Sequence, residues 1–259
     1  MDTISIGKHN PRLADIRKAI QRDALTSDGL LVVEGPTLVA EAHNSGIAID
    51  ALFVREGTSL EGLPATSTVY MLDPTVFKTI QDTEHSQGVV ALVRPRHWNL
   101  SDVLTRVKSP VVVLAGLQDP GNVGTILRVA ESFGAAGCLG LTGTVAIHNS
   151  KVTRASAGSV FRLPHTWNLK MEAVVDSLQV SGVPLIGTSP RAGDSITSWD
   201  WTRPSAVLIG NEGAGLSREQ VSACTAMLRI PHEAKTESLN SAIAAAVILY
   251  EAYRRRKLG

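Results

Sequence analysis

The second half of the chain repeats one unit, and this repeat constrains the fold more than any other feature. In each copy, a short apolar run precedes a turn bearing glycine or proline and then a helical pattern. The runs are continuous rather than alternating, which is typical of strands covered on both faces, and so of a parallel sheet between helices. They are PVVVLAGL (110–117), GCLGLTG (137–143), VPLIGTSP (183–190), SAVLIGNEG (205–213) and AMLRIP (226–231).

A parallel α/β sheet also predicts where a ligand binds. In such sheets, ligands lie outside the carboxyl ends of the strands. The residues that follow the five apolar runs are therefore the first candidates for a functional site.

The first half of the chain shows a different sequence pattern, in which short strand-like and helix-like segments alternate. This alternation predicts a small α/β domain. Expected helices cover 11–22, 37–46 and 74–82, and expected strands cover 30–35, 51–54, 69–72 and 88–95. Because 94–108 holds few apolar residues in a pattern, we expect a domain at 1–93, a linker at 94–108 and a second domain at 109–259.

The composition excludes several classes of protein. The net charge of the 259 residues is only +1, so the chain does not bind nucleic acid through bulk positive charge. Its two cysteines, Cys138 and Cys224, cannot form a disulfide framework, and we expect both to be buried. The apolar runs are too short to span a membrane, and the first residues lack a signal-peptide core. We therefore expect a cytoplasmic protein.

The loop after the first run holds a polar pair. Asn122 stands where an N-cap is expected, and apolar residues at helical spacing follow it. Arg128 lies about 9 Å further along the predicted helix, and its long side chain leans back towards the amino-terminal end. Both side chains can therefore face one site, although a capped helix with a solvated arginine explains the same residues.

The loop after the fourth run is rich in glycine. Gly210, Gly213 and Gly215 surround Asn211 and Glu212 in the sequence GNEGAGLS. Glycines in a tight loop allow positive φ and let the backbone approach a ligand closely. The spacing differs from that of a phosphate-binding loop and includes no lysine, which disfavours a nucleoside triphosphate.

The loop after the fifth run leads into the last helix. We expect this helix to begin at Thr236 or Glu237, with Ser238 and Asn240 in its first turn. Simple capping is an alternative role for both polar residues. An alanine-rich body follows at 242–249, which suits close packing against another helix, either within the domain or from a second chain.

The three loops, in this order, resemble the SpoU, or TrmH-like, family of RNA 2′-O-ribose methyltransferases. The similar segments are PGNVGTILRVAESFGA, IGNEGAGLS and RIPHEAKTESLNSAIAAAVILYE, together with KVTRASAGSVFRLP (151–164). NPRLADIRK and LLVVEGPTLVAEAHNSG resemble the small substrate-binding domain of the family, so the resemblance covers nearly the full length. One departure is His232, which stands where many relatives have methionine.

The resemblance implies a fold, a cofactor and a site. The implied fold is α/β, with a parallel-sheet domain containing a deep trefoil knot and a small amino-terminal α/β domain resembling the L30e/L7Ae-like fold. The implied cofactor is S-adenosylmethionine, used without a metal, in a homodimer formed through the carboxyl-terminal domain. The cofactor would lie against Thr188, Gly210, Asn211, Glu212, Gly213, Ile230, Ser238, Leu239 and Asn240. The implied catalytic residues are Asn122, Arg128, Glu212, Ser238 and Asn240.

The resemblance also implies a role for Arg128. Because a guanidinium rarely loses its proton in a protein, we expect Arg128 to stay cationic and to stabilise negative charge on the ribose 2′-oxygen. Asn122 and Asn240 would orient it.

The expected partner is a structured RNA, more in keeping with ribosomal than with transfer RNA. The candidate RNA contacts are Lys8, Arg12, Arg17, Lys18, Arg22, Lys151, Arg154 and Arg162. With few aromatic residues available for stacking, recognition of RNA shape is favoured over reading of single-stranded bases.

Three other functions fit parts of the sequence. A Rossmann-type nucleotide enzyme would have a parallel sheet, but the first strand of this one is not followed by GxGxxG. A non-catalytic RNA-binding module of the same fold would not need the polar residues named above. Base methylation through a cysteine nucleophile would need Cys138 or Cys224 in a reactive setting.

Overall fold

The computed structural model describes residues 2–65, 68–105, 108–233 and 237–257. They form two compact units, one of Met1–His97 with Ala146–Phe161 and the other of Trp98–Val145 with Arg162–Gly259. A segment expected in the second domain thus packs with the first unit. The expected three-part division stays a prediction about independently folding domains.

The first unit is built on a five-stranded mixed sheet in the order β1-β4-β3-β5-β2. Its core contains Leu13, Ile16, Phe53 and Phe77. The strands are β1 (Asp2–Ser5), β2 (Leu31–Glu34), β3 (Ile49–Arg55), β4 (Thr68–Leu72) and β5 (Val89–Val93). The helices are α1 (Pro11–Arg22), α2 (Pro36–Asn44), α3 (Pro74–Phe77), α6 (Ser150–Ala155) and the 3-10 helix η1 (Ser159–Phe161).

The second unit is a seven-stranded sheet, parallel in every pairing, in the order β10-β12-β9-β11-β6-β7-β8. Its strands are β6 (Val111–Ala115), β7 (Gly137–Leu141), β8 (His165–Leu169), β9 (Leu185–Thr188), β10 (Asp194–Ser195), β11 (Ala206–Gly210) and β12 (Ala226–Arg229). Its helices are α4 (Leu100–Leu104), α5 (Pro120–Ser132), α7 (Met171–Val180), α8 (Arg218–Ser222) and α9 (Ser241–Lys257).

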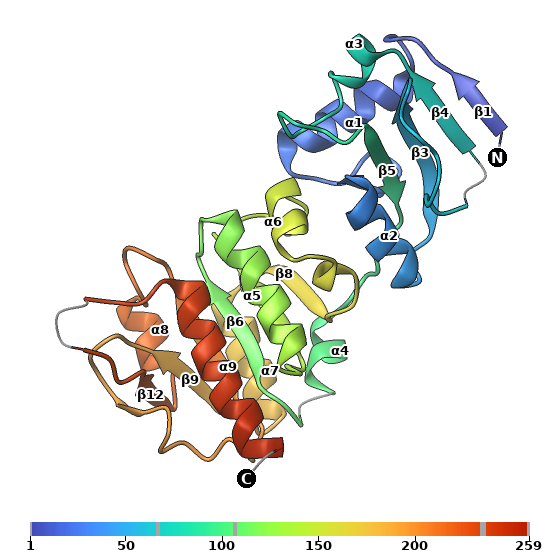
Figure 1. Cartoon of the computed structure of the whole chain (residues 1–259). Helices are drawn as coiled ribbons and strands as arrows, with labels where there is room; N and C mark the ends of the chain where they lie inside the picture. Colours follow the sequence, from blue (N-terminus) through green and yellow to red (C-terminus); the bar gives the residue numbers. More distant parts are fainter. Residues whose placement is uncertain (1, 66–67, 106–107, 234–236, 258–259) are drawn as a thin grey trace. The chain divides into compact units, whose positions relative to one another are not determined.

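Helices cover both faces of this sheet, with α5 and α9 in front of it and α7 behind it in Figure 1. Every residue of β6 and β7 is buried. This double coverage is the physical reason that the strands read as continuous apolar runs. The predicted parallel α/β sheet is confirmed, with one strand inside each of the five runs.

Several elements differ from the sequence-based expectations. β1 was not predicted, and α3 ends at Phe77 rather than at residue 82. β8 and β10 lack an apolar run because β8 is a partly exposed edge strand and β10 has only two residues. The expected linker contains α4, whose first turn is closed by a reciprocal capping box between Asn99 and Asp102.

The starts of two helices were predicted wrongly. Asp119, not Asn122, caps α5: its side chain accepts the backbone N–H of Asn122 at 2.7 Å. Pro120 at the first helical position leaves no N–H there, so the cap precedes it. α9 begins at Ser241 rather than at Glu237, because the side chain of Asn240 accepts the first free N–H groups; Thr236 lies outside the described residues.

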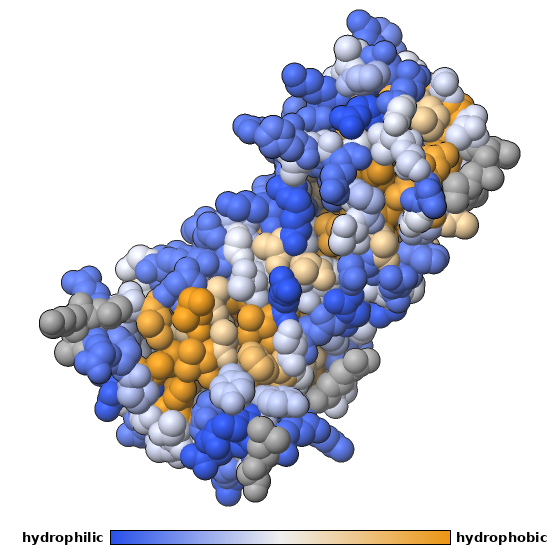
Figure 2. Space-filling model, in the orientation of Figure 1, coloured by the Kyte–Doolittle hydropathy of each residue, from blue (hydrophilic) through white to orange (hydrophobic). Residues whose placement is uncertain are grey.

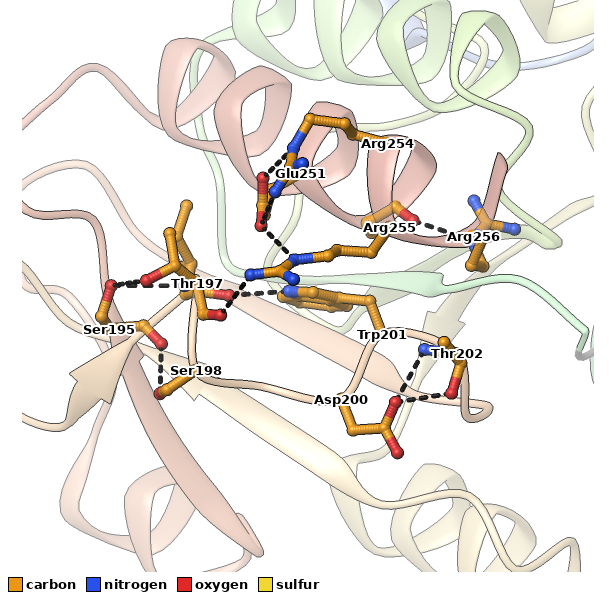
Figure 3. A network of polar contacts seen from close by, with 12 residues as sticks. Ser195, Thr197, Ser198, Asp200, Trp201, Thr202, Glu251, Arg254, Arg255 and Arg256 are labelled. Carbon is orange, nitrogen blue, oxygen red and sulfur yellow. Dashed lines mark hydrogen bonds and ion pairs between the residues drawn. The ribbon is translucent and has the colours of Figure 1, made fainter. Parts of the chain in front are cut away.

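The carboxyl-terminal end of α9 is held by a polar network, drawn in Figure 3. The buried carboxylate of Glu251 accepts hydrogen bonds from the guanidinium groups of Arg254 and Arg255, each at 2.9 Å. Arg255 also donates to the carbonyl oxygen of Thr197 at 3.0 Å. Arg256 donates to the side chain of Ser109 and to the carbonyl oxygen of Phe133. Arg255 and Arg256 therefore fasten the last helix to distant loops, whereas the ion pair of Arg254 lies within the helix.

We expect Glu251→Gln to reduce the pH dependence of stability in acid. The hydrogen bond from Arg254 is the main cause that lowers the pKa of Glu251 below its usual 4.5, and burial opposes it. A lowered pKa gives stability that is complete above the unfolded value and is lost as the pH falls through the folded one. At pH 7 the variant should be about 1 kcal/mol less stable, a modest value because the arginines are partly solvated.

Thermal melting between pH 3 and pH 7 measures this effect. As the pH falls below 4.5 and through the lowered pKa of the folded protein, the curves of the two proteins should converge. Parallel curves across the whole range would contradict a stabilising carboxylate at this position.

None of the described helices combines the length and the apolar character needed to cross a membrane.

Candidate active site

A cavity of about 620 Å³ lies at the carboxyl ends of β9, β11 and β12. It is formed by the loops that follow these strands and by the start of α9. All nine residues expected to contact a cofactor line it: Thr188, Gly210, Asn211, Glu212, Gly213, Ile230, Ser238, Leu239 and Asn240. Residues from four distant segments thus surround one space, as the carboxyl-edge argument predicts.

The glycine-rich loop is folded around Asn211. Its side chain donates to the carbonyl oxygen of Gly116 at 2.8 Å and accepts the N–H groups of Gly213 and Ala214. Its backbone exchanges two hydrogen bonds with Gly215, which has a φ of 68°. Asn211 therefore fixes the loop as a structural residue, while the loop backbone forms part of the cavity wall.

Gly210 is required by the loop itself. A Cβ atom at this position would lie 2.6 Å from the carbonyl carbon of Gly215, closer than real Cβ contacts. The missing side chain is thus explained first by close approach within the protein.

The cofactor implied by the resemblance leaves S-adenosylhomocysteine as its product. We expect Gly210→Ala to weaken binding of this product about 10-fold, because the loop must move to admit the methyl group of alanine. Titration calorimetry measures the affinity. Gly7→Ala is the control, since a Cβ there meets no atom within 4 Å. Unchanged affinity in Gly210→Ala would mean that the loop position does not matter for this ligand.

A series of hydrogen-bonded polar side chains lies beside the cavity. The side chain of Asn240 donates to that of Asn122 at 3.0 Å, and Asn122 donates to the carboxylate of Glu212 at 3.1 Å. The backbone N–H of Gln118 also approaches Glu212, at 3.4 Å. Three of the five predicted catalytic residues are thus directly connected. Asn240 has two roles, since it also caps α9.

The other two predicted catalytic residues do not take part in this series of hydrogen bonds. Ser238 is exposed and lines the cavity. Arg128 is exposed on α5 and does not line the cavity; within the described part of the chain, its guanidinium has no hydrogen-bond or ion-pair partner. Within one chain, the structure therefore does not bring Arg128 to the predicted cofactor contacts.

Sequence reasoning missed much of the remaining wall. One part is apolar, with Met227 and Leu228 on β12 and Ala244 and Ile248 on α9. Hydrophobic residues at helical spacing do not reveal which face borders a cavity. His232 also lines the cavity, and its Nδ1 lies 2.8 Å from the carbonyl oxygen of Ile230.

The predicted RNA contacts fall into two groups. Four of the basic side chains are engaged: Arg12 with Asp50, Arg17 with Thr79, Arg154 with Asp82 at 2.7 Å, and Arg162 with Glu131 at 2.6 Å. The other four, Lys8, Lys18, Arg22 and Lys151, are exposed and have no side-chain partner among the described residues. They are the cations best able to meet phosphate groups without first breaking an ion pair.

The cysteines differ in burial. Cys138 is buried, as expected, and burial raises the pKa of its thiol. Cys224 is only partly buried, which corrects the expectation for it, although burial still raises its pKa to about 11. Neither thiol is activated, which disfavours a cysteine nucleophile. The described residues include no cluster of three or more His, Cys, Asp or Glu side chains able to hold a metal ion.

Comparison with family models divides the chain in two. Residues 109–250 match the model of the SpoU rRNA Methylase family, and residues 10–91 match the MRM3-like substrate binding domain.

Similar proteins match over almost the whole length. The 23S rRNA (guanosine(2553)-2'-O)-methyltransferase RlmP of Bacillus subtilis is 29% identical, with 93% of this chain and 95% of RlmP covered. A tRNA/rRNA methyltransferase of Synechocystis, slr1673, is 33% identical, with 95% and 92% covered. The AdoMet-bound rRNA methyltransferase structure from Sinorhizobium meliloti has a TM-score of 0.86 at 30% identity, with 99% of each chain covered. AviRb from Streptomyces viridochromogenes, in complex with AdoMet, has a TM-score of 0.84 at 28% identity, with 97% and 100% covered.

Proposed function

The chain belongs to the SpoU rRNA methylase family, and from this premise we propose that it transfers a methyl group from S-adenosylmethionine to a ribose 2′-hydroxyl of a structured RNA. The observation that carries the proposal is the convergence of nine expected contact residues on one cavity. A non-catalytic RNA-binding module would not need the connected side chains of Asn122, Glu212 and Asn240.

The cavity fits the proposed cofactor. Its volume of about 620 Å³ lies within the range of small-molecule sites, and both backbone groups and apolar side chains line it. The glycine-rich loop and the residues before α9 would hold the cofactor, which supplies a methyl group already activated by a positively charged sulfur. No further activation of the donor by the protein is then needed, so the protein acts on the acceptor hydroxyl.

We propose that Arg128 acts on the acceptor of the methyl group, the ribose 2′-hydroxyl. A guanidinium keeps its proton and presents several donors, so it can stabilise negative charge on the 2′-oxygen and grip a neighbouring phosphate. Asn122, held between Glu212 and Asn240, fixes the first turn of the helix that carries Arg128.

We propose that the active site is completed in a homodimer. α9 buries one face in its own unit and leaves Ile243, Val247 and Tyr250 on the other, 54%, 36% and 49% exposed. They are spaced at four and three residues, so they form one apolar stripe, and Figure 2 shows hydrophobic side chains gathered over this region. A second copy seated on this stripe could supply the Arg128 that each cavity lacks in one chain.

Two finer features of the fold are part of the proposal. We propose the deep trefoil knot for the carboxyl-terminal domain because this domain matches the SpoU rRNA Methylase family, whose members the resemblance describes as knotted. We propose an L30e/L7Ae-like fold for the amino-terminal domain, which combines a five-stranded mixed sheet with helices and matches a substrate-binding domain.

We favour ribosomal RNA as the substrate. RlmP and the RlmB protein of Ralstonia nicotianae are both named for 23S rRNA, and RlmP is similar over almost its full length. An amino-terminal substrate-binding domain is also in keeping with a large folded RNA.

The decisive experiment supplies the protein with methyl-labelled S-adenosylmethionine and total RNA. A 2′-O-methylated ribose resists alkaline cleavage, so the labelled position can be mapped. We expect one dominant site in large ribosomal RNA. Label in transfer RNA alone would overturn the preference for ribosomal RNA, and label in a base or in no RNA would overturn the proposed reaction.

A further inference from the structure

Ser241 has an unpaired polar group in the cavity wall. It is the first residue of α9, it lines the cavity and it is only 8% exposed. Its hydroxyl group is buried and has no hydrogen-bond partner in the described part of the chain. Buried polar groups in folded proteins almost always have a partner, so a missing one on a residue that lines a ligand cavity indicates that a bound ligand supplies the partner.

The same residue offers a second donor. The first N–H groups of a helix have no partner within the helix. The side chain of Asn240 accepts two of them, from Ala242 at 2.9 Å and from Ile243 at 3.2 Å. The N–H of Ser241 is left without a partner among the described residues. Two donors thus stand together at the positive end of a helix of 17 residues.

We propose that Ser241 binds the carboxylate of the methionyl part of S-adenosylmethionine, an inference that rests on the proposed function of the cavity. Two donors at a helix amino terminus favour an anion, and this carboxylate is the only anionic group of the cofactor. The sulfonium and ammonium groups are cations and would be disfavoured there. The hydroxyl oxygen is shielded from solvent, so it reaches the ligand by rotating about the Cα–Cβ bond into another staggered position.

Ser241→Ala tests the proposal with two ligands. S-adenosylhomocysteine carries the carboxylate, whereas 5′-methylthioadenosine has the same nucleoside and sulfur but lacks the amino-acid part. By titration calorimetry, the variant should bind S-adenosylhomocysteine about 10-fold more weakly than the original protein, the effect of losing one hydrogen bond to a charged group. Its affinity for 5′-methylthioadenosine should be unchanged.

Ser222→Ala is the matched control. Its hydroxyl is bonded to the carbonyl oxygen of Arg218 and lies outside the cavity lining, so this variant should bind both ligands normally. Equal affinity of Ser241→Ala and the original protein for S-adenosylhomocysteine would overturn the proposal, as would equal weakening for both ligands. Failure of the original protein to bind either ligand would instead overturn the proposed function.

The stability of the ligand-free variant is an independent readout. Removing a buried hydroxyl that has no partner should leave the melting temperature of Ser241→Ala unchanged or raise it. A fall of several degrees would mean that the hydroxyl has a partner inside the protein, which also overturns the proposal.

Discussion

Arg128→Ala should lower the rate of methyl transfer about 100- to 1000-fold, the usual cost of removing a group that stabilises developing negative charge. Because Arg128 is assigned to the acceptor ribose and not to the cofactor, the affinity for S-adenosylhomocysteine should change less than about twofold. Single-turnover transfer to RNA and titration calorimetry give the two quantities separately. Loss of cofactor affinity in place of rate would show that the assignment is wrong.

Arg128→Lys distinguishes charge from geometry. Lysine keeps the positive charge but not the planar fork that binds two oxygens at once. If Arg128 holds the 2′-oxygen and a phosphate together, Arg128→Lys should recover only a small part of the lost rate. Near-normal turnover in this variant would argue against two-point binding.

Val247→Glu should convert the proposed dimer into monomers and abolish methyl transfer. The substitution would bury a charge at the centre of the apolar stripe on α9, and an unpaired buried charge costs several kcal/mol. Light scattering after size-exclusion chromatography measures the mass. Val180→Glu is the matched control, because that valine is 90% exposed at the end of α7. A monomeric but fully active Val247→Glu protein would contradict the composite site.

Mixing two inactive variants tests which chain supplies the arginine. If Arg128 serves the cavity of the partner, heterodimers of Arg128→Ala and Glu212→Gln contain one intact site. Random mixing should then restore about a quarter of the original activity. If each cavity uses its own Arg128, no heterodimer has an intact site and the mixture stays inactive.

The strands of the second unit can be predicted from the sequence because buried strands appear in it as continuous apolar runs. β6 and β7 are wholly buried and read as apolar runs, whereas the edge strand β8 is partly exposed and gives no such signal. The start of α5 shows a second limit. Asn122 and Asp119 are both good caps, and only the position of Pro120 decides between them.

The site was predictable where it depends on strand ends and not where it depends on distant side chains. The ends of the apolar runs marked the loop that holds Gly210 and the segment that leads to Asn240, and the resemblance to the SpoU family assigned these two residues to the cofactor site. The ion pairs of Arg154 and Arg162 join residues 72 and 31 positions apart, so no local pattern separates these arginines from solvated ones. The sequence does not single out Ser241, because its missing hydrogen-bond partner becomes visible only in three dimensions.

Hydrogen bonds at both ends of α9 connect this helix to two different parts of its unit. Asn240 connects the first end to α5, and Arg256 connects the other to the residues before β6 and after α5. Ala244 and Ile248, which lie between these two ends of α9, border the cavity. We therefore expect a substitution at Arg256 to shift Ala244 and Ile248 slightly and so to weaken ligand binding without contacting any residue that borders the cavity.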